Sequence, residues 1–219
     1  MSPLAADLAK DTAQIVFGWA LGLGSAVAVD RWKKRRQSEA AKNGISLEFR
    51  ELALRLVLVV YKLEARKGQV DRKLLEWMQP YIERYAGPNP TERILASVAG
   101  LLKASDAQLA QFAEHLKATT PRFFFPKEES SYATAIVSQV HDFDPDYAVR
   151  VLDILSHLRM FNEAREDRMY YHHLTFAGGL TPENHDRALA NIDAADDLVS
   201  LQARAIVEKI GVLAQKYPI

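Results

Sequence analysis

The chain has 219 residues, enough for one sizeable hydrophobic core. Its hydrophobic fraction of 48% excludes an intrinsically disordered protein, and 28 basic residues balance 28 acidic ones, so the net charge gives no indication of a nucleic-acid or acidic ligand. The absence of cysteine excludes disulfides, thiolate metal sites and cysteine nucleophiles.

The first predicted element is an apolar helix over residues 13–29, which contain no charged residue. About 17 residues is the lower limit for a helix that crosses a bilayer. The basic residues after Asp30 would place the remaining chain in the cytoplasm by the positive-inside rule. We therefore predict an all-α, single-pass membrane protein with an N-terminal anchor over residues 1–37 and a cytoplasmic helical domain over residues 38–219.

Two sets of residues carry this prediction. The apolar anchor residues are Ile15, Val16, Phe17, Trp19, Leu21, Leu23, Val27 and Val29. The basic residues expected to set the topology and to contact anionic lipid are Arg31, Lys33, Lys34, Arg35 and Arg36.

Two other interpretations of the apolar segment stay open. A signal peptide is suggested by Ala26-Val27-Ala28, but the segment lacks a basic N-terminal flank and precedes a basic cluster that opposes export. A buried helix of a soluble protein is suggested by Gln14, Ser25 and the glycines, which lower the hydropathy. Small residues at Gly18, Gly22 and Ala26 would let two such helices approach and self-associate, although the pattern also recurs by chance.

Short amphipathic helices are predicted between residues 45 and 118. Asn43-Gly44 is expected to end the basic extension of the first helix, and Ser46 to begin a second helix with one apolar stripe. Further helix starts are indicated at Asp71 and at the capping box Ser105-Asp106-Ala107-Gln108, with a loop at Gly87-Pro88-Asn89-Pro90.

A long antiparallel helical hairpin is predicted over residues 144–216. Asp144-Pro145 and Thr181-Pro182 are typical helix starts, and Gly178-Gly179 separates the two arms. Each arm would be roughly 45–50 Å long at 1.5 Å per residue. The expected seam of the second arm contains Ala188, Ile192, Ala195, Leu198, Leu201, Ala205, Ile210 and Leu213.

Several residues are candidates for partner contact. The adjacent rings of Phe123, Phe124 and Phe125 lie between two prolines, where they either cover the core or meet a partner or a bilayer. The hairpin adds Glu166, in a stretch that is polar on all sides, and Tyr170, Tyr171, His172 and His173 near the end of the first arm.

No sequence motif indicates a catalytic, metal-binding or cofactor-binding site. His157 follows Asp153 by one turn, but the paired Glu-x-x-His pattern of carboxylate-bridged metal bundles is missing, so we expect no metal and no cofactor. Phosphate-binding loops, nucleophile elbows and HExxH are also missing from the sequence.

The function predicted from these features is a membrane-tethered binding or signalling module. It would contact membrane lipid and recruit a protein partner or form a homo-oligomer, and nucleic acid is not expected as a partner. One alternative is a membrane-perturbing effector, toxin-like or part of phage defence, which its cytoplasmic helical domain would trigger. The other alternative is an enzyme of unrecognised type.

Overall fold

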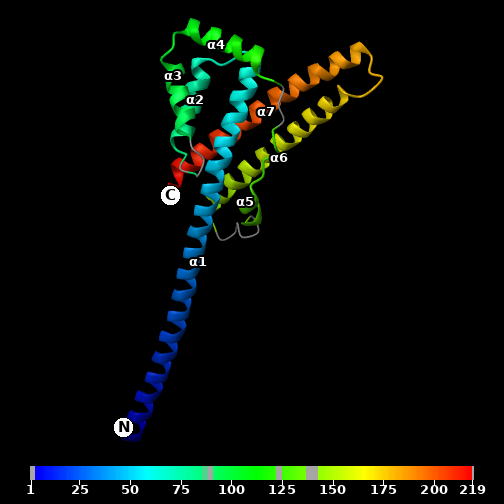
Figure 1. Cartoon of the computed structure of the whole chain (residues 1–219). Coiled ribbons are helices and arrows are strands. Elements are labelled where there is room, and N and C mark those ends of the chain that lie inside the picture. The colour runs from blue at the N-terminus through cyan, green and yellow to red at the C-terminus, as the bar shows by residue number, and fades with distance from the viewer. Residues whose placement is uncertain (1–2, 86, 88–90, 122–124, 137–142, 219) are drawn as a thin grey trace. The chain divides into compact units, whose positions relative to one another are not determined.

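The computed structural model describes residues 3–85, 87, 91–121, 125–136 and 143–218, and the side chains of these residues from 28 onward. Over this part of the chain the protein is all-helical, so the all-α prediction is confirmed (Figure 1). The helices are α1 (Pro3–Lys67), α2 (Arg72–Glu83), α3 (Glu92–Leu102), α4 (Asp106–Thr119), α5 (Ser131–Ile136), α6 (Pro145–Leu174) and α7 (Pro182–Lys216).

The chain divides into two compact units, residues 1–43 and residues 44–219. The first unit consists of the N-terminal part of α1. The second unit contains the C-terminal part of α1 and all the other helices, and its core is built from the apolar faces of α1, α2, α6 and α7.

The predicted transmembrane helix is wrong. Within the described part of the chain, no helix combines the length with the hydropathy that a membrane crossing requires. The apolar segment is instead the opening part of the 65-residue helix α1, which continues through Asp30 and the basic cluster. Among the predicted anchor residues, the side chain of Val29 is exposed. The side chains of Ile15, Val16, Phe17, Trp19, Leu21, Leu23 and Val27, and those of Gly18, Gly22 and Ala26, lie outside the described residues.

Asn43-Gly44 does not end a helix, because α1 runs through both residues. Downstream burial explains the continuity, since Ile45 and Phe49 are fully enclosed by the core. Gly44 itself has a packing role: a Cβ atom at this position would lie 2.2 Å from a ring carbon of Tyr132. The glycine therefore admits the ring of Tyr132 beside the helix, and it does not serve as a helix stop.

The predicted starts of α2 and α4 are confirmed. The Asp71 carboxylate accepts a hydrogen bond from the backbone N–H of Leu74 at 2.8 Å. Ser105 and Gln108 form the reciprocal capping box, in which each side chain accepts from the backbone N–H of the other residue. These caps satisfy backbone donors that a helix N-terminus otherwise leaves without partners.

The predicted hairpin is formed by α6 and α7, which lie side by side (Figure 1). The Asp144 carboxylate caps α6 and the Thr181 hydroxyl caps α7. The seam of α7, however, was partly assigned to the wrong face. Leu198 and Leu201 are exposed, whereas Val199 and Ile206 are fully buried. The buried positions Ile192, Val199, Ile206 and Leu213 repeat every seven residues, which is the spacing of a helix packed along a partner helix.

Candidate functional site

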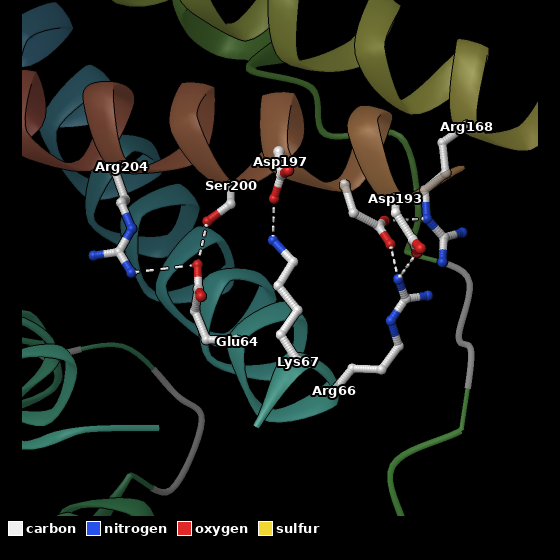
Figure 2. A network of polar contacts seen from close by, with 9 residues as sticks. Glu64, Arg66, Lys67, Arg168, Asp193, Asp197, Ser200 and Arg204 are labelled. Atoms are coloured by element: carbon white, nitrogen blue, oxygen red, sulfur yellow. Dashed lines mark hydrogen bonds and ion pairs between the residues drawn. The ribbon is translucent and has the colours of Figure 1, made fainter. Parts of the chain in front are cut away.

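A buried charged cluster joins α1, α6 and α7 (Figure 2). At its centre is Asp196, which is completely inaccessible to solvent. Its Oδ1 accepts a hydrogen bond from Arg168 Nε at 2.5 Å, and its Oδ2 lies 2.5 Å from Arg66 Nη2. One carboxylate therefore links the end of α1 to both arms of the hairpin.

Charge and aromatic contacts compensate the burial of these arginines. Asp193, with a side chain that is 60% exposed, accepts a hydrogen bond from Arg66 at 2.8 Å, so two carboxylates balance two guanidinium groups. The guanidinium of Arg168 also lies over the ring of Phe125, 5.1 Å from its centre. Buried ion pairs are costly to desolvate and need such additional contacts to persist.

A second row of polar contacts continues the junction between α1 and α7. Glu64 accepts hydrogen bonds from the Ser200 hydroxyl at 2.8 Å and from Arg204 at 3.5 Å, and Lys67 pairs with Asp197 (Figure 2). Arg204 also stacks over the ring of Trp77 in α2, 4.7 Å from its centre. The hairpin is thus held to the bundle over several turns of α7.

Residues 125–128 are attached to α6 by hydrogen bonds. Asn162 exchanges two hydrogen bonds with the backbone of Glu128, and Arg165 donates to the carbonyl of Phe125 at 2.8 Å. The buried carboxylate of Glu128 lies 3.2 Å from Arg55. Burial raises the pKa of Glu128 above its ordinary value, although the charge of Arg55 opposes that shift.

The hairpin carries exposed rings beyond this cluster. Tyr170 is 61% exposed and Phe176 is 76% exposed, and His173 is also exposed. Tyr171 and His172 are half-buried, and the ring of His172 lies 5.1 Å from that of Phe176. We call residues 169–187 the hairpin tip. In Figure 1 the tip extends beyond the other helices of the second unit.

The other residues predicted to contact a partner do not belong to the hairpin tip. Glu166 lies exposed on α6 before the tip, and Phe125 is buried against Phe161 at a ring distance of 6.2 Å. Phe123 and Phe124 lie outside the described residues.

The sequence analysis did not identify Asp196, Arg66 and Arg168 as a cluster, although one signal for Arg168 was present. Arg168 occupies the next position of a seven-residue series formed by the buried residues Tyr147, Ile154 and Phe161.

The predicted basic residues lie in the first unit. Their side chains are exposed on α1, and the guanidinium of Arg36 lies over the ring of Trp32, 4.2 Å from its centre. The residues concerned are Arg31, Lys33, Lys34, Arg35 and Arg36.

In the part of the chain that the structure describes, no three side chains of the metal-ligating types lie together as a metal site would require. His157 instead makes a 2.8 Å hydrogen bond with Gln202 across the hairpin and lies 3.7 Å from Asp153.

Comparisons with protein-family models, with curated proteins and with solved structures found no match for this chain.

Proposed function

We propose that this protein is a helical binding module that recruits a protein partner through the hairpin tip. The observation that carries the proposal is the exposure of Tyr170 and Phe176 at the end of two long, packed helices. Large rings are enriched in the cores of protein interfaces, where they remove much apolar surface from water. The buried cluster around Asp196 supports the proposal because it holds the helices that present these rings.

The tip provides contacts of more than one kind. Tyr171 lies beside Tyr170 and His172 beside Phe176, and both side chains can form hydrogen bonds, as can the exposed His173. An apolar centre bordered by polar groups is the usual composition of a protein interface. A second copy of the chain is one possible partner, and a different protein is the other.

We expect the double substitution Tyr170→Ala and Phe176→Ala to remove the partner while leaving the fold intact. Both side chains are exposed, so the melting temperature should change little, whereas loss of two anchoring rings should weaken binding at least tenfold. Affinity purification with quantitative mass spectrometry, together with sedimentation velocity for self-association, measures the effect.

The matched control is Val149→Ala with Leu201→Ala. These residues are 65% and 61% exposed and lie outside the tip. The control should retain the partner or oligomer that the wild-type protein forms. Equal recovery of that partner with the tip variant would contradict the assignment of the tip as the interface.

We propose a second interaction, between the basic segment of residues 31–36 and the head groups of anionic lipids. Five exposed cations lie within six residues, and each basic side chain near an anionic membrane surface contributes about 1 kcal/mol to binding. The exposed indole of Trp32 adds a side chain that favours the membrane–water interface.

Glutamine at positions 31, 33, 34, 35 and 36 should reduce sedimentation of the full chain with phosphatidylserine vesicles at least about tenfold, because each replacement removes one of these attractions. Arg93→Gln with Lys103→Gln, which changes two exposed basic residues elsewhere, should have little effect. Equal binding of the wild-type chain to neutral phosphatidylcholine vesicles would show that charge does not drive the interaction.

A further inference from the structure

A pocket of about 350 Å³ opens between the C-terminal part of α1, the end of α2 and the end of α7. Its apolar wall includes Ala53 of α1 and Ile210 and Ala214 of α7. Gly211 contributes no side chain, and a Cβ atom there would lie 3.4 Å from the ring of Tyr81. The pocket volume falls at the lower end of the range of about 300–1,000 Å³ that is usual for small-molecule sites.

Two tyrosines form the side of the pocket that α2 provides. The ring of Tyr81 is held by that of Trp77 at a distance of 5.7 Å, and the hydroxyl of Tyr85 donates a hydrogen bond to Glu51. Burial and the nearby charge of Glu208 raise the pKa of Tyr81, whereas the charge of Arg84 lowers it. Tyr81 therefore stays protonated near neutral pH, and its hydroxyl can donate a hydrogen bond into the pocket.

The two charged residues that line the pocket are both basic, and the carboxylates of Glu51 and Glu208 lie next to it, beside Tyr85 and Tyr81. Its lining contains Arg50, which is half-buried, and Arg84, which is exposed, but no aspartate or glutamate. Neither guanidinium forms a side-chain hydrogen bond or ion pair with another described residue. By contrast, eight other arginines of residues 44–219 lie within ion-pair distance of a carboxylate: Arg55, Arg66, Arg72, Arg150, Arg159, Arg168, Arg187 and Arg204.

We propose that this pocket binds a small molecule that combines a carboxylate or phosphate group with a short apolar body. Arg50 and Arg84 would bind the anionic group, because guanidinium matches the planar geometry of carboxylate and phosphate oxygens. The apolar body would contact Ile210 and the space beside Gly211. This site is separate from the hairpin tip, so the proposal does not depend on the protein-binding function.

Calorimetric titration of the full chain with four probes tests the chemistry. Hexanoate and hexyl phosphate should bind at least tenfold more tightly than hexanamide, which has the same apolar chain without the charge. Inorganic phosphate, which lacks the chain, should also bind at least tenfold more weakly than hexyl phosphate. Equal affinity for hexanoate and hexanamide, or failure of both anionic probes to bind, would overturn the proposal.

Three variants test the location of the site. Arg50→Gln with Arg84→Gln should weaken hexanoate binding at least tenfold, while Arg93→Gln, an exposed arginine on α3, should leave it unchanged. Gly211→Leu should abolish binding by filling the pocket, and a thermal melt separates this effect from unfolding. Undiminished binding by a folded Gly211→Leu protein would place hexanoate elsewhere and overturn the assignment.

Discussion

Replacing Asp196 with alanine is expected to lower the free energy of unfolding by about 3–5 kcal/mol, the usual cost of removing one partner from a buried ion pair. The substitution would leave Arg168 enclosed without a carboxylate, and Arg66 with only the exposed carboxylate of Asp193. Arg168 Nη2 already has no hydrogen-bond partner among the described residues, and the substitution would leave Nε without its partner as well. Chemical denaturation followed by circular dichroism measures the change.

Two comparisons separate this effect from a general loss of negative charge on α7. Asp197→Ala removes a carboxylate that is 71% exposed one residue away, and it should cost no more than about 1 kcal/mol. Adding Arg168→Met to the Asp196→Ala protein should recover part of the lost stability, because the uncompensated charge is then removed. A loss for Asp196→Ala as small as that for Asp197→Ala would show that the cluster does not stabilise the fold.

Substituting Ile206 with aspartate is expected to destabilise the protein by about 3–5 kcal/mol. Ile206 is fully buried in the seam of α7, so the variant loses its apolar contacts and places a carboxylate in a position that is closed to solvent. Leu201→Asp makes the same chemical change at an exposed position of the same helix and should stay within about 0.5–1 kcal/mol.

Melting temperatures of the two aspartate variants measure this difference directly. Ile206→Asp should melt many degrees lower than the wild-type protein, whereas Leu201→Asp should melt close to it. The opposite order would restore the seam predicted from the sequence, in which Leu201 faces the first arm of the hairpin.

The misassigned seam shows what periodicity in one sequence can decide. The sequence predicted both arms of the hairpin, because caps, prolines and glycines mark the helix ends through local geometry. Periodicity did not decide which face of α7 is buried, because this helix has two apolar stripes. Leu198 and Leu201 belong to one stripe, and Val199 and Ile206 belong to the other. Only packing against neighbouring helices decides which stripe is buried, and those neighbours are distant in sequence.

The candidate sites were accessible to sequence reasoning to different degrees. Tyr170, Tyr171, His172 and His173 of the tip could be selected from the sequence because they end a long helix shortly before two glycines, whereas the exposed ring of Phe176 was missed. In the cluster around Asp196, only Arg168 carries a sequence signal, its place in a series of buried positions. Arg66 and Asp196 resemble ordinary surface charges, and Asp196 lies 28 positions from Arg168 and 130 from Arg66. The pocket arginines cannot be told from other arginines in the sequence, because their common place on one pocket is a property of the folded chain.

The contacts between α1 and α7 also affect the order in which the protein folds during its synthesis. Glu64 pairs with Ser200 across 136 positions, so the ribosome makes the end of α1 long before the helix that its polar side chains contact. Until α7 emerges, Glu64, Arg66 and Lys67 at the end of α1 have none of their partners Ser200, Asp196 and Asp197. Translation that stops before α7 is complete would therefore leave the charged end of α1 without these partners, and incompletely folded chains of this kind are prone to aggregate.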